Sequence, residues 1–159
     1  MTTKSIITES TRGVGRLRQI FYNPELLPTL TEDQAIDEVI AREKEVGLLV
    51  GEFWIVKHID LPEKLGEDRF FEAWESNNGV ISINMEKARA IHMDLIRSVR
   101  NQKLSELDSQ YMRAIEANNN DAKKTIEKEK QILRDIPQTF DLSANTAEQL
   151  IQKWPSVLD

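Results

Sequence analysis

The sequence predicts an α+β protein, in which a small mixed head with two or three short strands precedes a long helical hairpin and a short C-terminal helix. Two observations lead to this fold class. Short segments rich in β-branched and aromatic residues, separated by turn residues, occupy the first half of the chain. Residues 88–111 contain no Pro or Gly, and a second helical run over residues 122–136 follows an asparagine-rich break. A helical hairpin of this kind favours a protein held by other proteins over one with a catalytic pocket.

At 159 residues the chain is long enough for one hydrophobic core, and its 40% hydrophobic and 30% charged residues are typical of a soluble protein. It has no run of about 18 apolar residues, so we expect no transmembrane span. The N-terminus lacks the apolar core of a signal peptide. The absence of cysteine excludes disulfides and thiolate metal sites, and the net charge of −6 argues against a general affinity for nucleic acid or anionic lipid.

The pattern divides the chain into four regions, namely a basic N-terminal arm (1–13), the α+β head (14–84), the helical hairpin (85–136), and a linker with a short helix (137–159). Charge is spread unevenly, because residues 1–24 carry four basic side chains against one glutamate, whereas residues 25–52 are strongly acidic. We expect the arm to pair with that acidic segment, with a partner's acidic surface or a phosphate group as alternatives. Residues 12–16 lack the full pattern of a phosphate-binding loop and are interpreted as a flexible turn.

The head begins with residues 16–22, which are rich in β-formers and predict a strand that Asn23-Pro24 ends. Thr31 and Gln34 have the spacing of a capping box. We therefore expect a helix from there to about Glu45, with a glycine just beyond it as the residue that ends it.

The rest of the head contains two further strand candidates. Residues 48–56 are the stronger one, because branched and aromatic side chains are dense there. Residues 67–74 suggest a short helix. The Asn77-Asn78-Gly79 segment is a strong turn signal, and the alternation over residues 80–84 predicts a strand after it.

The long helix of the hairpin carries residues at helical spacing along one side. These are Met93, Ile96, Arg100, Leu104, Leu107, Tyr111 and Ala114. At 1.5 Å per residue this helix extends roughly 45–50 Å and the second about 22 Å, so the second covers only part of the first. The uncovered part carries Ile91, Leu95 and Val99 on a neighbouring stripe. It is therefore expected to meet the head, a second copy or another partner.

The partner-contact candidates are Ile91, Leu95, Val99, Arg100, Leu104, Leu107, Tyr111 and Trp154. Arg100 is awkward to bury alone, so a facing carboxylate on a partner is expected. Self-association through the long helix is one outcome of such a surface, and a monomer whose head covers the first stripe is the alternative.

The second helix is expected to end at Ile136, because the residue before Pro137 is disfavoured in the helical region. Residues 137–145 are interpreted as a linker. A short helix then follows, with Asn145 as its cap, and Pro155 stops it.

The chain has only two histidines, and neither predicts catalysis. His58 lies near Asp60, but a turn before Leu61-Pro62 explains that aspartate equally well. His92 lacks the neighbouring ligands of a metal site and is expected to be structural or on the surface. The acidic stretch over residues 60–75 lacks the ligand pattern of a calcium loop. We therefore expect no enzyme activity and no catalytic, cofactor-binding or metal-binding residues.

Basic residues gather on about a third of the circumference of the long helix. They are Arg89, Arg97, Arg100 and Lys103. Taken alone, they form a basic stripe that nucleic acid could contact. Carboxylates surround the stripe, however, and no aromatic residues interleave for base stacking. A solvated or salt-bridged face is the favoured interpretation, and nucleic-acid binding is the alternative.

Several fragments, in this order, resemble a group of small tailed-bacteriophage proteins found among tail and tail-fibre genes. In the head they are Asp60-Leu61-Pro62, Asp68-Arg69, Phe71 and Ala73-Trp74-Glu75. Along the long helix they are Ile83-Asn84-Met85-Glu86-Lys87-Ala88-Arg89, Arg97, Arg100, Leu104, Leu107-Asp108, Tyr111, Arg113-Ala114 and Glu116. The last are Leu133-Arg134-Asp135-Ile136-Pro137, Thr146-Ala147-Glu148-Gln149-Leu150 and Trp154-Pro155. The resemblance covers roughly residues 54–157 and does not extend to the first 50.

This resemblance implies a phage tail-associated protein that acts by protein–protein contacts, either as a virion component of the tail or tail fibre or as an assembly factor. It implies no catalytic residues. Other phage structural proteins would be the partners, in the host cytoplasm during assembly or in the virion. The alternatives are a phage regulator that binds nucleic acid through the basic stripe and an inhibitor of a host protein.

Overall fold

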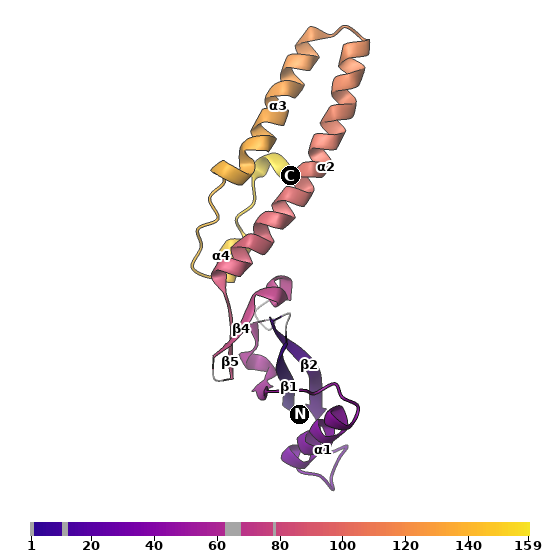
Figure 1. Ribbon diagram of the computed structural model, residues 1–159, viewed down its shortest axis with the longest axis vertical. Coiled ribbons are helices and arrows are strands. Elements are labelled where there is room, and N and C mark those ends of the chain that lie inside the picture. The colour runs from indigo at the N-terminus through magenta and orange to yellow at the C-terminus, as the bar shows by residue number, and fades with distance from the viewer. Residues whose placement is uncertain (1, 11–12, 63–67, 78) are drawn as a thin grey trace. The chain divides into compact units, whose positions relative to one another are not determined.

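The computed structural model describes residues 2–10, 13–62, 68–77 and 79–159 (Figure 1). They belong to two compact units, Met1–Ala88 and Arg89–Asp159, called unit 1 and unit 2 below. Unit 1 contains two small antiparallel sheets, and the chain continues into two long helices and a short C-terminal helix. The predicted α+β fold class is therefore confirmed.

Unit 1 is built on a three-stranded antiparallel sheet with β1 in its centre. The strands are β1 (Thr2–Ser10), β2 (Gly13–Tyr22) and β3 (Phe53–Lys57), in the order β2-β1-β3. Ile6 and Ile7 are neighbours on β1, and both are fully buried. Because successive side chains of a strand point to opposite faces, both faces of this sheet are covered.

One face of the sheet packs against α1 (Glu32–Glu45), and the core between them contains Ile6, Ile20, Ile36 and Leu49. The other face packs against the hairpin of β4 (Trp74–Asn77) and β5 (Val80–Ile83). Its core contains Ile7, Val56, Leu61, Trp74 and Ile81. The short helices η1 (His58–Asp60) and η3 (Asp68–Ala73) connect β3 to β4. Unit 1 is thus a sheet between a helical and a β layer.

Helix α1 has the ends that the sequence predicts. The Thr31 hydroxyl accepts the Gln34 backbone N–H at 3.2 Å, and the Gln34 side chain accepts the Thr31 N–H at 2.8 Å. At the other end Gly47 has φ +72° and the Leu48 N–H donates to the Glu43 carbonyl at 2.9 Å. These bonds satisfy the main-chain groups that a helix leaves without intrahelical partners.

Three expectations for unit 1 are wrong. Residues 2–10, expected in a basic arm, form the central strand β1, because Ile6 and Ile7 supply apolar side chains to both faces. Residues 13–16, expected in a flexible turn, belong to β2, and residues 11–12 lie outside the described residues. The strand expected over residues 48–56 starts only at Phe53, because Gly51 adopts φ +85° and breaks the extended backbone.

Strand β4 was missed by the sequence interpretation, which assigned its first residue to a short helix. The observed 3-10 helix covers Asp68–Ala73, and residue 67 lies outside the described residues. Trp74 instead pairs with Ile83 of β5, and Asn77 pairs with Val80. Pairing with the predicted β5 determines the extended backbone here, since strand propensity depends strongly on tertiary context.

The helical hairpin is confirmed. Its helices are α2 (Met85–Glu116), which begins in unit 1, and α3 (Asn120–Thr139). Asn118 turns the chain with φ +49°, and the Asn119 side chain caps α3 by accepting the Ala122 N–H at 3.0 Å. Across the hairpin Lys130 forms an ion pair with Asp108.

Helix α3 was expected to end before Pro137. It instead continues through Pro137 to Thr139. A proline in the last turn removes only one helical N–H, and two bonds hold this turn nevertheless. The Phe140 N–H donates to the Ile136 carbonyl, and the Thr139 hydroxyl donates to the Asp135 carbonyl, both at 2.9 Å.

The C-terminal helix α4 (Ala147–Ile151) is present, but its cap is Thr146 and not Asn145. The Thr146 hydroxyl accepts the Gln149 N–H at 3.3 Å, and the Asn145 N–H donates to the Gln149 side chain. A short 3-10 helix, η4 (Ser156–Leu158), follows. Over the residues that the structure describes, no helix is both long and apolar enough for a membrane span.

Candidate partner-contact site

The C-terminal segment of unit 2, residues 140–159 and called the tail below, returns along α2 (Figure 1). Arg89 donates to the Ala144 carbonyl at 2.7 Å, and a ring nitrogen of His92 lies 2.8 Å from the Lys153 carbonyl. Further along α2, the Lys103 ammonium donates to the main-chain oxygens of Val157 at 3.0 Å and Asp159 at 2.6 Å. The tail therefore lies along α2 from Arg89 to Lys103.

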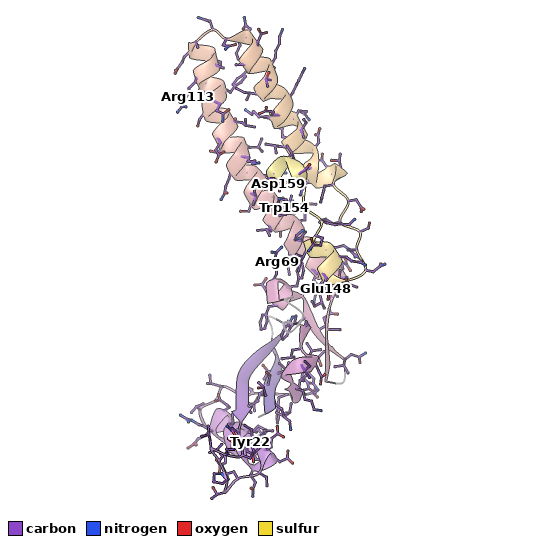
Figure 2. The ribbon with its side chains drawn as sticks, turned by 180° about the vertical axis from the view of Figure 1, so that it is seen from behind. Tyr22, Arg69, Arg113, Glu148, Trp154 and Asp159 are labelled. Atoms are coloured by element: carbon purple, nitrogen blue, oxygen red, sulfur yellow. The ribbon has the colours of Figure 1, made fainter. Side chains whose placement is uncertain are left out.

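Apolar side chains complete the contact between the tail and the rest of unit 2. The tail buries Leu142, Ala144, Ala147, Leu150 and Leu158. His92 is fully buried, and its ring meets the Trp154 ring edge-on at a centroid distance of 6.1 Å. Figure 2 shows Trp154 and Asp159 beside α2. Of the two expectations for His92, a structural residue or one on the surface, its complete burial excludes the second.

The tail corrects our account of the uncovered part of α2. We expected the stripe of Ile91, Leu95 and Val99 to meet the head, a second copy or another partner. The chain's own tail is a fourth neighbour for this part of the helix, since it contacts the fully buried His92 and also Lys103, which lies one helical turn after Val99. Ile91 and Val99 are half-buried, and Leu95 remains 40% exposed. The tail was missed because hydrophobic periodicity marks an apolar face without showing what covers it.

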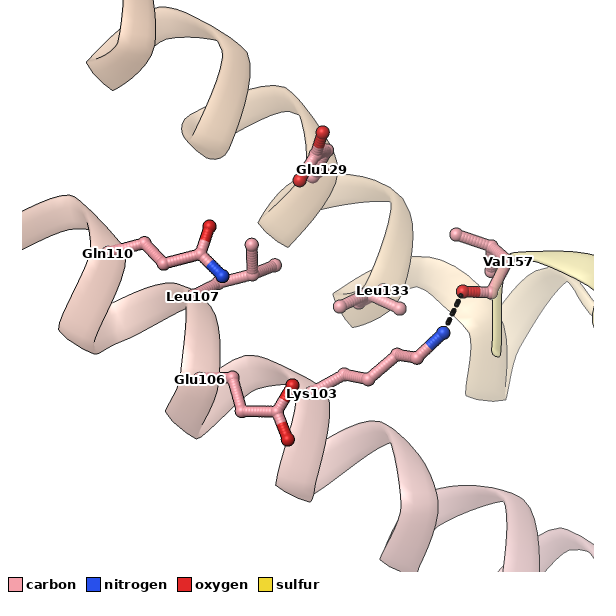
Figure 3. Close-up of a pocket in the computed structure, with 7 residues that line it drawn as sticks. All are labelled: Lys103, Glu106, Leu107, Gln110, Glu129, Leu133 and Val157. Atoms are coloured by element: carbon pink, nitrogen blue, oxygen red, sulfur yellow. Dashed lines mark hydrogen bonds between the residues drawn. The ribbon is translucent and has the colours of Figure 1, made fainter. Parts of the chain in front are cut away.

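Where α2, α3 and the tail meet, unit 2 has a hollow of about 330 Å³ (Figure 3). This hollow, called the junction hollow below, is lined by Lys103, Glu106, Leu107, Gln110, Glu129, Leu133 and Val157. Leu107 and Leu133 are buried and form its apolar floor, whereas Val157 is 37% exposed. Its volume is at the lower end of the range for ligand sites, about 300–1,000 Å³.

The basic side chain of the junction hollow is bonded within unit 2, whereas its two acidic side chains are not in ion pairs there. The Lys103 ammonium is occupied by the two tail oxygens described above, as Figure 3 shows for Val157. Glu106 and Glu129 are exposed and have no ion pair within residues 89–159, all of which the structure describes. The free charge at this place is therefore negative, above an apolar floor. Such a surface suits the aliphatic stem and the cationic end of a lysine or arginine side chain.

The predicted contact residues are only partly brought together. Leu107 lies on the floor of the junction hollow, and Leu104 is half-buried one helical turn before it. Tyr111 instead belongs to the α2–α3 interface, where its hydroxyl donates to the Glu127 carboxylate at 2.8 Å. This hydrogen bond raises the pKa of Tyr111 above its usual range. Trp154 packs on His92 and so serves the fold of unit 2.

The carboxylate expected to face Arg100 is one of a partner protein, and it stays a prediction. Within unit 2 the Arg100 guanidinium donates twice to the Asn101 side chain, at 2.9 and 3.3 Å. The sequence interpretation also missed most of the junction hollow, namely Glu106, Gln110, Glu129, Leu133 and Val157. The i, i+4 spacing of Glu106 with Gln110, and of Glu129 with Leu133, was the available signal.

Each member of the predicted basic stripe has a neighbour in unit 2. Arg97 forms an ion pair with Asp94 at 2.8 Å, and Arg100 bonds to Asn101. Arg89 and Lys103 hold the tail. Of these contacts within unit 2, only that of Arg97 is an ion pair, and the other three basic residues bond to neutral groups, so the interpretation as a salt-bridged face holds for Arg97 alone.

For catalysis and metal binding, the described residues give two further observations. They contain no group of three or more His, Asp or Glu side chains that could hold a metal ion. The side chain of His58 lies outside the described residues, and His92 is not among the residues that line the junction hollow.

Comparison of the chain with protein-family models, with curated proteins and with solved structures gives no match. The residues and their geometry are therefore what supports a function.

Proposed function

We propose that this protein is a bacteriophage tail-associated protein that acts by protein–protein contacts and has no catalytic role. It serves either as a virion component of the tail or tail fibre, or as an assembly factor in the host cytoplasm. The ordered sequence fragments over residues 54–157 support the phage tail part of the proposal. Its partners are then other phage structural proteins.

The observation that supports binding by contact is the junction hollow. Its two buried leucines offer an apolar floor, and Glu106 and Glu129 offer carboxylates that no cation of unit 2 occupies. A lysine or arginine of a phage partner can lay its methylene stem on Leu107 and Leu133 and place its charge between the carboxylates. Because the carboxylates are exposed, they contribute more to the association rate and to partner choice than to affinity.

Mass spectrometry of purified virions, alongside the lysate of infected cells, tests the proposal. A virion component is found in both samples, and an assembly factor is found in the lysate bound to tail or fibre proteins. A protein found only in the lysate, without tail or fibre proteins bound to it, would contradict both forms.

A matched pair of variants tests whether the junction hollow binds the partner. Glu129→Lys reverses a charge at the hollow, whereas Glu116→Lys makes the same change at an exposed position at the end of α2. We expect Glu129→Lys to lower the amount of this protein in virions or tail complexes about tenfold, because the introduced ammonium repels the cation of the partner. Equal incorporation of both variants would place the contact elsewhere.

A further inference from the structure

The outer edge of β3 in unit 1 is an unpaired strand edge. Strand β3 is the last in the order β2-β1-β3, and it pairs with β1 from Phe53 to Lys57. In an antiparallel pair, every second residue directs its N–H and C=O away from the partner strand. Among the described residues, no further strand pairs with β3, so these groups remain available for an additional strand.

Two hollows flank this edge, one on each face of the sheet. The first, of about 490 Å³, lies between β3 and the start of β5, and Val56, Asp60, Val80 and Ile81 help to line it. The second, of about 420 Å³, lies between β3 and α1, and Asp33, Ile36, Asp37 and Ile40 help to line it. Ile55 and Lys57 of β3 line both hollows, so the strand edge stands between them.

Apolar side chains are exposed at the same place. Ile55 is 37% exposed and Val80 is 68% exposed. Gly79, which precedes Val80, lies close to Trp54, because a Cβ at Gly79 would be 3.0 Å from the Trp54 ring. The hairpin of β4 and β5 therefore packs closely on β3 at Trp54 while the first hollow stays open at Val80.

An added strand would send alternate side chains into the two hollows, since side chains alternate between the faces of a sheet. On the β5 side the residues offered are largely apolar, which suits branched apolar side chains. On the α1 side, Asp33 and Asp37 lie one helical turn apart, and Lys4 is already paired with Glu32 at 3.4 Å. Among the described residues that line this hollow, the carboxylates of Asp33 and Asp37 are therefore free, against one free cation, Lys57. This excess of negative charge suits a basic side chain of the added strand.

We propose that β3 binds an extended segment of a partner protein as an added strand, with branched apolar side chains toward β5 and basic side chains toward α1. Main-chain hydrogen bonds to β3 hold the segment, and the two hollows select its alternating pattern. This site lies in unit 1 and does not rest on the junction hollow of unit 2 or on a phage origin.

A titration of the ¹⁵N-labelled full chain with a synthetic peptide tests this. The peptide is an acetylated and amidated seven-residue strand in which three valines alternate with two lysines between terminal threonines. We expect amide shifts in β3, in β5 and in α1. Two further peptides carry N-methyl groups either on the valines or on the lysines. Because only one edge of the added strand faces β3, we expect one of these peptides to lose binding and the other to keep it.

Variants of the protein supply the second arm. Val80→Lys places a charge in the β5-side hollow, and Val50→Lys is its control, because Val50 is 74% exposed and lines neither hollow. We expect Val80→Lys to weaken peptide binding at least about tenfold and Val50→Lys to leave it unchanged. Asp37→Lys, at an exposed position of α1, is expected to weaken binding from the other face.

Three outcomes would overturn the proposal. One is the absence of shifts in β3. Another is binding that both N-methylated peptides retain, which would indicate attraction by charge alone. The last is a concentration-dependent dimer whose β3 amides shift without peptide, since the occupant of the edge would then be a second copy.

Discussion

His92 is a fully buried polar side chain whose ring nitrogen lies 2.8 Å from a main-chain oxygen 61 residues later. His92→Ala would leave the Lys153 carbonyl without this bond and open a cavity beside Trp154. We expect it to lower the free energy of unfolding of unit 2 by about 3 kcal/mol. Urea denaturation followed by circular dichroism at the helical minimum measures the loss.

His92→Gln is the control, because it keeps a side-chain N–H donor at this position. We expect it to recover part of the stability that His92→Ala loses. Equal midpoints for the alanine variant and the natural chain would show that the tail does not depend on this contact.

Asp141 makes tail stability depend on pH. The Ser143 hydroxyl at 2.6 Å and the Lys153 ammonium at 2.9 Å both stabilise its carboxylate. These two hydrogen bonds, with the Ser143 N–H, hold the pKa of Asp141 well below its usual range. Because the pKa is lower in the folded chain than in the unfolded one, the stabilisation is complete above the ordinary value of 3.8 and is lost as pH falls below it.

Asp141→Asn tests this dependence. We expect the urea midpoint of the variant to change less than that of the natural chain as pH falls from neutral to about 3. Asp94→Asn is the control, since Asp94 makes an exposed ion pair with Arg97 within one helical turn. Parallel pH profiles for Asp141→Asn and the natural chain would refute the assignment.

For single residues, the sequence indicated what kind of role a side chain has but not which residue it contacts. His92 was expected to be structural or on the surface because no neighbouring ligands complete a metal site around it. That it meets Trp154 could not be predicted, because no local pattern links residues 62 positions apart. Leu107 was a predicted contact residue because it lies on the apolar stripe of its own helix. Glu129 was not, because its place in the junction hollow depends on the packing of α3 beside α2.

Two glycines of unit 1 lie next to a helix or a strand, and they differ in what surrounds them. Gly47 after α1 and Gly79 before β5 have similar φ values, +72° and +83°. A Cβ at Gly47 meets nothing within 4 Å, whereas at Gly79 it would lie 3.0 Å from Trp54. We expect Gly47→Ala to cost about 1 kcal/mol and Gly79→Ala about 2–3 kcal/mol in urea unfolding of unit 1.

A double variant separates the two causes at Gly79. Trp54→Leu removes the ring, so the excess cost of Gly79→Ala should fall toward the cost at Gly47 in that background. If the excess persists without the ring, steric contact with Trp54 is not its cause.

The elements that the sequence predicted are those with local chemical signals. Helix α1 has a capping box and a terminal glycine, and β5 follows an Asn-Gly turn, so their positions were close to the observed ones. Strands β1 and β4 lack such signals and owe their extended backbone to pairing with β2, β3 and β5. Helix α3 passed Pro137 because the end of its last turn is held by the Thr139 hydroxyl, a contact that a rule about prolines does not include.

For the whole chain, the tail decides whether α2 presents an apolar surface. Removal of residues 141–159 would uncover the fully buried His92, which contacts Lys153 and Trp154 of the tail. We expect the shortened chain to self-associate, since a newly exposed apolar face on a soluble protein favours association. Light scattering measures the mass, and the full chain is the reference at 18.3 kDa.

The same measurement bears on self-association of the full chain. A mass of 18.3 kDa for the full chain would show that the tail leaves no self-association surface on α2. A mass of two chains, without concentration-dependent shifts of the β3 amides, would restore the α2 stripe, with its 40% exposed Leu95, as an interface. A shortened chain that stays monomeric and fully helical would contradict the covering role of the tail.

The contacts of unit 2 also differ in how much chain they enclose, which sets an order of folding. Tyr111 and Glu127 are 16 residues apart, whereas His92 and Lys153 are 61 apart. Closing the longer loop costs about 1 kcal/mol more in chain entropy, so the hairpin can form before the tail docks. During synthesis the ribosome also releases α2 and α3 before the tail. We therefore expect the tail to be the last part of unit 2 to fold, which would leave the apolar side of α2 bare until the tail docks.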